Sequence, residues 1–564
     1  MDINTILEVK NLSVAFGGRP VVENVSYRLE KGKALGIVGE SGSGKSVSSL
    51  ALMGLLPRTA TVTGAAKLGD TDLLALDEEG FREVRGKRIS MIFQEPMTSL
   101  NPVQRCGEQV MEMMRAHQST PNNQNNQNSP KDQVIELFRE VLLPRPEKIF
   151  DSYPHELSGG QKQRVMIAMA LINHPDIIIA DEPTTALDVT VQKTILELLR
   201  VLQKKHGISI IFISHDLGVI AQIADDILVM YQGKVVERGA TSDILNSPKH
   251  PYTQGLLACR PPLEGRPRRL PTVEDYMSGK LGADDGGRRG EDEERKTEDG
   301  IGKPLLSVRS LSVEYVLKKS FIGRPLQKLK AVDGISFDVF RGETLGIVGE
   351  SGCGKTTLGR ALLRLLESRS EQIVFEGKRI DQMSQREMRE MRTKMQIVFQ
   401  DPYSSLNPRI TLGDAIMEPL LAHGVMRSRE EARCKVLDLM ERVGLKKEWF
   451  SRYPHEFSGG QRQRICIARA LILNPELVVC DESVSALDVS VQAQVLNLLG
   501  ELKERFGYTY LFISHDLSVV HYVADRIMVM KSGRIVESGD TDEVYRHPKE
   551  EYTRCLLEAI PRME

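Results

Sequence analysis

The stretch ALGIVGESGSGKS (residues 34–46) passes from a short apolar run directly into a glycine-rich loop that ends in Lys-Ser. An apolar run of this length predicts a buried strand, and the loop matches the pattern GxxxxGK[ST]. Glycines at these places let the backbone wrap closely round phosphate groups and present its N–H groups to them. The sequence therefore predicts a strand, a phosphate-binding loop and a helix in succession.

The same stretch returns as TLGIVGESGCGKT at residues 344–356, and the rest of a long repeat returns with it. SYPHELSGGQKQR (152–164) recurs as RYPHEFSGGQRQR (452–464), and FISHDL occurs at 212–217 and again 300 residues later (512−212). Self-similarity of this length predicts a duplicated domain rather than a chance recurrence of one motif.

The duplication predicts a first repeat at about residues 1–260 and a second repeat at 305–564, joined by a linker at 261–304. Within the linker, residues 279–304 are charged, Gly-rich and nearly free of large apolar side chains. Such a stretch cannot bury enough surface to offset its ordering entropy, so we expect it to be flexible. An Asn/Gln-rich stretch at 117–133 predicts a surface loop inserted in the first repeat.

Each repeat alternates short β-branched runs with amphipathic segments. DIIIA (176–180) and SIIFIS (209–214) predict buried parallel strands, and KTILELLRVLQKK (193–205) has the apolar spacing of a covering helix. LEVKNLSVAF (7–16) and VVENVSYRLEKG (21–32) alternate like antiparallel strands. The predicted fold class is α/β, a doubly wound core with a small antiparallel β subdomain and with ligands at the carboxyl ends of the strands.

The bulk composition argues against several classes of protein. A formal net charge of −2 does not suit a chain built electrostatically for nucleic acid. The seven cysteines show no CxxC pairing, which disfavours a disulfide scaffold or a structural zinc site. No apolar run approaches the ~20 residues that span a bilayer, and the opening MDINTILEVK lacks a signal-peptide core. We therefore expect a cytosolic, reduced protein.

The two phosphate loops supply the first candidate site residues. Lys45 and Lys355 are predicted to bridge the terminal phosphates of a nucleotide, while the hydroxyls of Ser46 and Thr356 ligate Mg²⁺. The alternative is a glycine-rich turn with a solvated lysine, which two well-flanked matches disfavour. The predicted nucleotide-binding loop residues are Gly39, Glu40, Ser41, Gly42, Ser43, Gly44, Lys45, Ser46, Gly349, Glu350, Ser351, Gly352, Cys353, Gly354, Lys355 and Thr356.

Acidic pairs follow a buried strand in each repeat. Asp181 and Asp481 end apolar runs, so their carboxylates are expected at the sheet edge, in the metal shell. Glu182 and Glu482 come next and are the candidates to polarise the attacking water. Alone, each pair is equally well explained as the start of a loop, and its place after a phosphate loop favours the catalytic interpretation.

Polar residues after two further strand ends in each repeat complete the candidate catalytic set. His215 and His515 follow FIS and are expected to contact the γ-phosphate, although a lone histidine at a strand end is usually structural. Gln94 and Gln400 follow SMIF and QIVF and are expected to reach the metal or the water. The whole constellation, rather than any one of these residues, carries the prediction.

LSGGQ (157–161) raises a separate question, because its serine and glycines precede an apolar helix and would bind an anion there. Together with the phosphate loop, the glutamine, the Asp-Glu pair, SALD or TALD and the histidine, it resembles the ATP-binding-cassette (ABC) ATPases over almost all of both repeats. That resemblance implies ATP hydrolysis by two tandem domains, each with a RecA-like, mostly parallel core, an antiparallel β subdomain and a helical subdomain.

The resemblance also implies that the two domains pack head to tail with ATP between them, so that LSGGQ binds the nucleotide held by the opposite repeat. Residues expected on the nucleotide of Lys355 are Ser158, Gly159, Gly160 and Gln161. Residues expected on the nucleotide of Lys45 are Ser458, Gly459, Gly460 and Gln461. Phe16 and Tyr315 match the family's adenine-stacking position, and a core role is the alternative for each.

Within that family the chain looks like a fusion of the two ATPase subunits of peptide and nickel importers. QEPMTSLNP (94–102) and QDPYSSLNP (400–408) resemble the segment where a permease helix docks, and HPYTQGLL (250–257) resembles the group's C-terminal extension. The resemblance implies two integral-membrane permease subunits, an extracytoplasmic binding protein and a peripheral position at the cytoplasmic face of the membrane. Dipeptide, oligopeptide, glutathione-like peptide and nickel all remain open as the transported substrate.

Some features depart from the pattern of these importers. Many relatives carry several cysteines after HPYT that hold an iron–sulfur cluster, whereas residues 258–276 hold only Cys259, so no cluster is expected. Cys353 replaces the Ser43 of the first phosphate loop, and its position near a lysine and a helix N-terminus predicts a lowered thiol pKa, with a simple packing role as the alternative. Both sites retain their glutamate and histidine, which predicts two active sites.

The rival interpretation is a soluble twin-cassette ATPase acting on ribosomes or nucleic acid. Ribosome-acting relatives usually have a long charged helical linker, and DNA-repair relatives carry zinc-binding cysteine modules. This chain has a Gly-rich linker and no such modules, so the sequence favours the importer ATPase.

Overall fold

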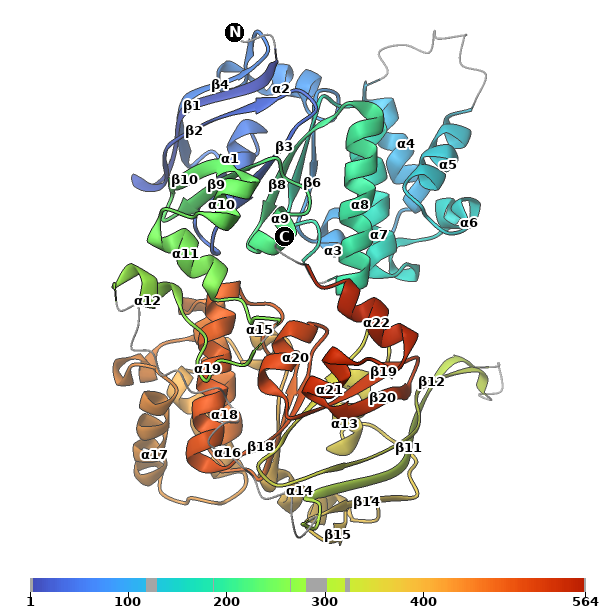
Figure 1. Cartoon of the computed structure of the whole chain (residues 1–564), viewed down its shortest axis with the longest axis vertical. Coiled ribbons are helices and arrows are strands. Elements are labelled where there is room, and N and C mark those ends of the chain that lie inside the picture. The colour runs from blue at the N-terminus through green and yellow to red at the C-terminus, as the bar shows by residue number, and fades with distance from the viewer. Residues whose placement is uncertain are drawn as a thin grey trace.

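The computed structural model describes residues 4–117, 129–185, 187–263, 265–279, 302–319 and 325–561. In Figure 1 the first repeat, coloured blue to green, lies above the second, coloured yellow to red. The linker residues 280–301 and the inserted residues 118–128 fall outside the described part of the chain, so the predictions made for them stay predictions.

Over the described residues, each repeat contains a four-stranded antiparallel sheet and a six-stranded, mostly parallel sheet. In the first repeat the orders are β2-β1-β4-β5 and β10-β9-β3-β8-β7-β6. The strands are β1 (Thr5–Phe16), β2 (Arg19–Glu30), β3 (Ala34–Val38), β4 (Ala60–Leu68), β5 (Thr71–Asp72), β6 (Ile89–Ile92), β7 (Ile177–Asp181), β8 (Ser209–Ser214), β9 (Asp226–Tyr231) and β10 (Lys234–Ala240).

The second repeat has the same pair of sheets, ordered β12-β11-β14-β15 and β16-β17-β18-β13-β19-β20. Its strands are β11 (Leu306–Lys319), β12 (Pro325–Val339), β13 (Thr344–Val348), β14 (Gln372–Phe375), β15 (Lys378–Arg379), β16 (Met395–Val398), β17 (Leu477–Asp481), β18 (Thr509–Ile513), β19 (Arg526–Lys531) and β20 (Arg534–Asp540). The predicted α/β class, with its antiparallel β subdomains, is confirmed.

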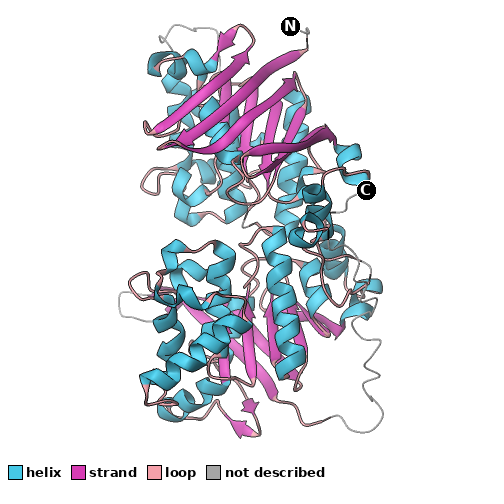
Figure 2. Cartoon of the chain, turned by 90° about the vertical axis from the view of Figure 1, so that its left-hand side faces the viewer, coloured by secondary structure: helices cyan, strands magenta, loops and turns pink. Residues whose placement is uncertain are grey.

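Helices cover the parallel sheets and form a separate helical part beside each of them. In the first repeat they are α1 (Lys45–Leu52), α2 (Glu78–Val84), α3 (Pro96–Ser99), α4 (Cys106–His117), α5 (Pro130–Glu140), α6 (Pro146–Asp151), α7 (Gly159–Leu171), α8 (Val189–His206), α9 (Leu217–Ile220), α10 (Thr241–Asn246), α11 (Pro251–Ala258) and α12 (Val273–Met277). Figure 2 shows the antiparallel strands of the first repeat at the top, with helices below them.

The helices of the second repeat follow the same plan. They are α13 (Lys355–Leu362), α14 (Gln385–Lys394), α15 (Pro402–Ser405), α16 (Leu412–Ala422), α17 (Arg429–Arg442), α18 (Gly459–Leu471), α19 (Val489–Phe506), α20 (Leu517–Val523), α21 (Thr541–Arg546) and α22 (Glu551–Glu558). Single 3₁₀ turns lie at Leu73–Ala75, Pro154–Glu156, Lys447–Ser451 and Pro454–Glu456.

The parallel strands are buried on both faces, which explains their uninterrupted apolar sequences. Every residue of β3 and of β8 is buried, and Ile37 on β3 pairs with Ile213 on β8 in parallel register. A strand covered on both faces has no solvent side to require alternation. All parallel strands end at one edge of the sheet, so the residues that follow them are brought together.

The loop predicted at 117–133 ends earlier than its composition indicates. Helix α5 begins at Pro130, where Ser129 and Asp132 form a capping box by exchanging hydrogen bonds between side chains and backbone. Serine before a proline and an acidic residue three positions later is a helix start signal. The prediction of a loop was therefore wrong for the last residues of this stretch.

Residues 265–279, which the repeat boundaries place in the predicted linker, are structured. They include α12, capped by the Thr272 side chain, which accepts a hydrogen bond from the backbone N–H of Asp275. Leu270 in the same segment is fully buried. The ordered chain that follows the first repeat therefore extends well beyond residue 260.

Candidate functional site

The phosphate loop of each repeat joins a buried strand to a helix N-terminus. Gly44 precedes α1 with φ 97°, in the left-handed region, and no side chain caps the helix. The N–H groups of the first turn are therefore not taken up by a capping side chain, which suits an anion. Gly39 lies so close to the neighbouring strand that a Cβ atom would come within 2.2 Å of the Met230 carbonyl oxygen.

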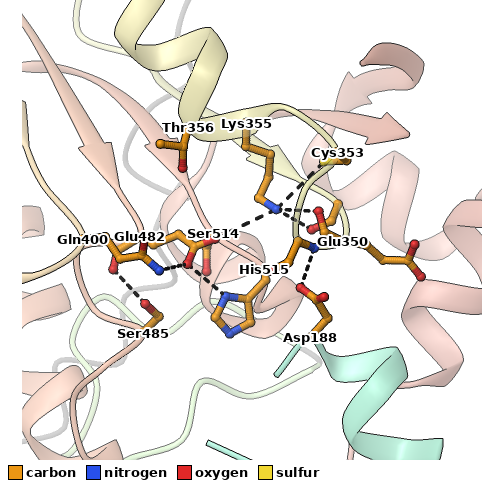
Figure 3. Close-up of polar contacts among 12 residues, drawn as sticks. Asp188, Glu350, Cys353, Lys355, Thr356, Gln400, Glu482, Ser485, Ser514 and His515 are labelled. Carbon is orange, nitrogen blue, oxygen red and sulfur yellow. Dashed lines mark hydrogen bonds and ion pairs between the residues drawn. The ribbon is translucent and has the colours of Figure 1, made fainter. Parts of the chain in front are cut away.

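A buried lysine lies inside each loop. The Lys45 ammonium donates hydrogen bonds to the carbonyl oxygens of Gly39 (2.7 Å) and Glu40 (2.9 Å). Lys355 makes the same pair of bonds in the second repeat, and its Nζ lies 3.9 Å from an oxygen of Glu482 (Figure 3). Burial lowers the pKa of Lys45, because desolvation opposes the charge, while the Glu182 carboxylate offsets part of that effect. A phosphate group in the loop would stabilise this buried charge.

A hydroxyl and a carboxylate meet beside each lysine. Ser46 donates a hydrogen bond to Asp181 (2.9 Å), and Thr356 donates one to Asp481 (2.8 Å). Burial raises the pKa of both aspartates, and the hydrogen bond from the hydroxyl opposes that shift. Among the described residues, the second oxygen of Asp481 is buried without a hydrogen-bond partner. Such an oxygen next to a hydroxyl fits a hard cation such as Mg²⁺.

The next residue in each repeat adopts a strained backbone conformation. Glu182 and Glu482 have φ of 45° and 46°, in the left-handed region that non-glycine residues rarely occupy. Their backbone N–H groups donate to the carbonyl oxygens of Ile213 and Ile513, each at 3.0 Å, which fixes the turn against the adjacent strand. Strain of this kind persists where the surrounding structure over-determines it, typically at functional sites.

Three polar side chains converge on the Glu182 carboxylate. Gln94 donates an amide hydrogen bond (2.9 Å), Thr185 donates its hydroxyl (3.0 Å), and Nδ1 of His215 lies 3.4 Å away. Burial alone would raise the pKa of Glu182, but His215 and the Lys45 charge outweigh it and hold the pKa below its ordinary value. Burial opposes the charged form of His215, yet the bond and charge of Glu182 raise the pKa of that imidazole.

The second repeat brings together the same groups with one difference. Gln400 donates to the Glu482 carboxylate (2.7 Å) and Nδ1 of His515 lies 3.5 Å from it (Figure 3). Ser485, at the position of Thr185, instead donates to the backbone carbonyl of Glu482 (2.9 Å). The structure thus places each predicted glutamine and histidine on the glutamate, with the Gln amide nitrogen directed at the carboxylate.

The LSGGQ segments form the start of α7 and α18. Ser158 and Gln161 form a capping box, in which each side chain accepts a hydrogen bond from the backbone of the other, and Ser458 and Gln461 repeat it. Gly160 lies against α8, where a Cβ atom would come within 2.7 Å of Val191. The serine and glutamine therefore set the helix start, and the glycine permits close packing of α7 on α8.

Aspartates at the start of α8 and α19 reach across to the phosphate loop of the other repeat. Asp488 accepts hydrogen bonds from the backbone N–H (3.1 Å) and the hydroxyl (2.9 Å) of Ser41. Asp188 accepts one from the backbone N–H of Ser351 (2.6 Å), and Figure 3 shows the Asp188 carboxylate near Glu350 of the same loop. Each phosphate loop is therefore hydrogen-bonded to the aspartate that ends the TALD or SALD motif of the opposite repeat.

The first turn of each of these helices adds a second cross-repeat contact. Thr190 donates its hydroxyl to Glu350 (3.0 Å), and Ser490 donates its hydroxyl to Glu40. Sequence reasoning used TALD and SALD as motifs but assigned no contact to these aspartates or hydroxyls. The available signal was the recurrence of both segments at an interval of 300 residues (488−188).

The remaining predicted residues are the two adenine-stacking candidates and Cys353 of the second phosphate loop. Phe16 is half-buried at the end of β1 and packs against the core of the antiparallel sheet, while Tyr315 on β11 is 39% exposed. The prediction of a lowered thiol pKa for Cys353 was wrong. Burial raises the pKa of the thiol, and the Lys355 charge offsets only part of that shift. Its proximity to lysine was right, since Nζ lies 3.9 Å from Sγ, but the sequence could not show that the sulfur is buried.

Comparison with known families covers both repeats. The family described as "ABC transporter" matches residues 22–185 and 332–485, and "Oligopeptide/dipeptide transporter, C-terminal region" matches 236–286 and 536–564. Over the described residues, no helix is long and apolar enough to cross a membrane.

Relatives at the level of sequence agree with that match. Proteins named "Glutathione import ATP-binding protein GsiA" from Escherichia coli K12 and Shigella flexneri are 47% identical over all of this chain and 91% of their own length. Solved structures of cbiO1 from Clostridium perfringens and of the MJ0796 cassette with ADP and Pi are 28% and 26% identical, each with a TM-score of 0.38. They cover 44% and 42% of this chain, and 92% and 99% of their own.

These matches favour the importer interpretation over an ATPase acting on ribosomes or nucleic acid, because the importer relatives align with the whole chain. The duplicated phosphate loops, acidic pairs and LSGGQ helices recur in one polypeptide with the matched C-terminal regions. The chain belongs to the ABC transporter family, as an ATP-hydrolysing importer subunit of the oligopeptide/dipeptide type with both cassettes in one polypeptide.

Proposed function

We propose that this protein drives the import of small peptides of the glutathione class, from the cytoplasmic face of the membrane, by closing its two repeats on two ATP molecules. The observation that carries the proposal is the 47% identity to glutathione import ATP-binding proteins over the full chain. The partners are two integral-membrane permease subunits and an extracytoplasmic binding protein.

Each ATP lies on one phosphate loop, with the lysine on its terminal phosphates. Lys45 and Lys355 are buried, and each would exchange its bonds to loop carbonyls for bonds to phosphate oxygens. Adenine stacks on Phe16 in the first repeat and on Tyr315 in the second. The exposed face of Tyr315 supports this assignment for the second site.

Mg²⁺ is held by Ser46 and Asp181 in the first site and by Thr356 and Asp481 in the second. The unpartnered oxygen of Asp481 supports this donor set among the described residues. When bound, the ion neutralises charge on the phosphates during transfer to water. Gln94 and Gln400 lie beside the glutamates and reach the ion or the water through their amide oxygens.

Glu182 and Glu482 accept the proton of the attacking water. A pKa held below its ordinary value keeps the Glu182 carboxylate ionised, and therefore able to accept a hydrogen bond from water at neutral pH. His215 and His515 orient these carboxylates through Nδ1 and contact the γ-phosphate with their other edge. The strained backbone at each glutamate keeps the carboxylate at the sheet edge.

The LSGGQ helices complete the sites from the opposite repeat. Ser158, Gly159, Gly160 and Gln161 close on the nucleotide of Lys355, and Ser458, Gly459, Gly460 and Gln461 close on that of Lys45. The bonds of Asp488 to Ser41 and of Asp188 to Ser351 support this head-to-tail pairing.

A permease helix docks beside α15 in the second repeat. A cavity of about 330 Å³ there is lined by residues of β16, α16 and α18, among them Glu418 and Arg469. Arg469 donates to the carbonyl of Ser405 (2.8 Å) and pairs with Glu418 (3.0 Å), which fixes one wall. Met169 occupies the equivalent position in the first repeat, so the two docking surfaces differ and suit two different permeases.

The test is affinity purification of tagged Glu182→Gln/Glu482→Gln protein from its own cells, in mild detergent with ATP and Mg²⁺. We expect two polytopic membrane proteins in equal amounts, and their binding protein should bind glutathione or a short peptide. Arg469→Met, which copies the first repeat, should lose one of the two permeases selectively. Recovery of ribosomal proteins or nucleic acid without any permease would refute the proposal.

A further inference from the structure

The segment that follows α11 leaves the first repeat, lies on the second, and returns. We call residues 265–272 the strap. At its far end α12 packs back on α11, where a Cβ atom on Gly255 would come within 2.9 Å of the Val273 backbone. Figure 1 shows α11 and α12 between the two repeats, next to the end of α19. The strap is thus fixed to the first repeat at both ends.

Its middle is bound to α19 by a buried two-point contact. The Asn497 side chain accepts a hydrogen bond from the Leu270 N–H (2.8 Å) and donates one to the Leu270 carbonyl (2.9 Å). Leu270 has no exposed surface and Asn497 is 8% exposed. Buried backbone groups must be paired, so removal of this amide would leave both Leu270 groups unsatisfied.

Three further contacts, made by Arg266 and Arg268, extend the binding site over α20 and α21. Arg266 donates to the carbonyl oxygen of Ala524 (3.0 Å) and forms an ion pair with Asp542 (3.2 Å). The buried Tyr522 hydroxyl donates to the carbonyl oxygen of Arg268 (3.3 Å). The second repeat therefore holds the strap at three separate points.

The residues that receive the strap distinguish the second repeat from the first. From Asp181 and Asp481 onward the repeats align at an interval of 300 residues, which pairs Asn497 with Glu197 and Tyr522 with Gln222. Glu197 is exposed on α8, whereas Asn497 is buried on α19. Asp542 likewise stands where the first repeat has Ser242. The second repeat therefore carries a dedicated receiving surface.

None of these partners belongs to the nucleotide-binding set. Asn497 lies nine residues along α19 from Asp488 (497−488), which is about 13 Å along the helix axis from the nucleotide edge. The contacts made at that edge, such as Asp488 with Ser41, join two loops that ATP itself would occupy. None of the strap contacts includes a residue of that edge.

We propose that the strap is a nucleotide-independent clasp that keeps the second repeat bound to the first when the ATP sites open. The clasp acts through the Leu270–Asn497 contact and the Arg266 bonds rather than through the linker. The linker can then be cut without separating the repeats. When the ATP sites open, the two repeats rotate about the clasp and do not separate from each other.

The test uses the full chain with a protease site inserted among residues 281–300 and an affinity tag on the second repeat. After cleavage and removal of nucleotide and Mg²⁺ with EDTA, the first repeat should remain bound in nearly equal amount. In Arg266→Ala/Asn497→Ala its recovery should fall at least about tenfold. Glu197→Ala, at the equivalent position outside the receiving surface, is the matched control and should behave like the parent.

A second variant tests whether release of the first repeat could instead come from misfolding of the receiving surface. Replacement of residues 266–270 by a Gly-Ser segment of equal length leaves the second repeat unchanged and should release the first repeat equally. Separation of the parent halves without nucleotide would overturn the proposal. Retention of the first repeat by both strap variants would overturn it as well.

Discussion

Asp488 accepts two hydrogen bonds from Ser41, one from its backbone N–H and one from its hydroxyl, although the residues are 447 positions apart in the chain. The reciprocal contact, Asp188 with the backbone N–H of Ser351, is a single bond. The two cross-repeat contacts are therefore related by pseudo-symmetry but are not equal.

Removal of the stronger contact should weaken ATP-driven closure. Asp488→Ala loses two solvent-exposed hydrogen bonds, each worth about 0.7–1.4 kcal/mol, so the ATP concentration for half-maximal hydrolysis should rise roughly 10- to 100-fold. Asp188→Ala is the matched variant and should produce a smaller rise. Equal shifts in the two variants would show that the difference in bonding has no energetic consequence.

The catalytic glutamates should be separable from ATP binding. Glu182→Gln replaces the carboxylate that faces Gln94 and His215 with an amide, which cannot accept a proton from water. Hydrolysis at that site should therefore fall about 10²–10⁴-fold. Binding of a fluorescent ATP analogue should remain within a few-fold of the parent. Glu482→Gln should act in the same way on the second site, and unchanged total turnover in either variant would contradict two active sites.

His521 should make the protein sensitive to mild acid. Burial and the Arg266 charge lower the pKa of this imidazole, while its hydrogen bond to Asp542 (3.0 Å) opposes the shift, and the Tyr545 ring packs beside it. A histidine whose pKa is lower in the folded protein than in the unfolded chain binds fewer protons in the folded state at pH values around those two pKa values. Its contribution to stability is therefore lost as the pH falls through the ordinary histidine range, near about 6.5.

The measurement is urea unfolding at a series of pH values between about 5 and 8. The parent should lose free energy of unfolding more steeply below about pH 6.5 than His521→Gln, which cannot take up the proton. Superimposable pH profiles would mean that His521 is not the titrating group.

The cysteines should differ in reactivity according to their burial. Cys434 and Cys555 are exposed, whereas Cys353 is buried with a raised pKa, so its reactive thiolate is scarce. Under limited maleimide treatment, followed by mass spectrometry, the exposed pair should be labelled at least about tenfold faster than Cys353. Fast labelling of Cys353 in the absence of nucleotide would instead support an activated thiol in the second phosphate loop.

Much of the fold was predictable because it depends on local pattern. The apolar runs before Gly39 and before Asp181 are long enough for strands and too short for helices, and their endings mark the sheet edge. The meeting of Gln94 and His215 at Glu182 follows from parallel topology, which collects strand ends at one edge.

Features that depend on tertiary burial were not predictable. Cys353 has the neighbours that lower a thiol pKa, but its burial reverses the direction of the shift. The strap falls inside the linker that the repeat boundaries predict, and its order depends on the pairing of Leu270 with Asn497, 227 residues away. The left-handed backbone at Glu182 is likewise imposed by the adjacent strand rather than by local sequence.

The reciprocal reach of Asp188 and Asp488 has a consequence for inheritance. Each aspartate binds the phosphate loop of the other repeat, so its substitution in one repeat acts on the loop of the other. Expression from one reading frame also fixes their ratio at one to one. The two repeats can therefore differ from each other, as they do at Asn497 and Glu197. Because they are joined in one chain, each repeat is always made together with its proper partner.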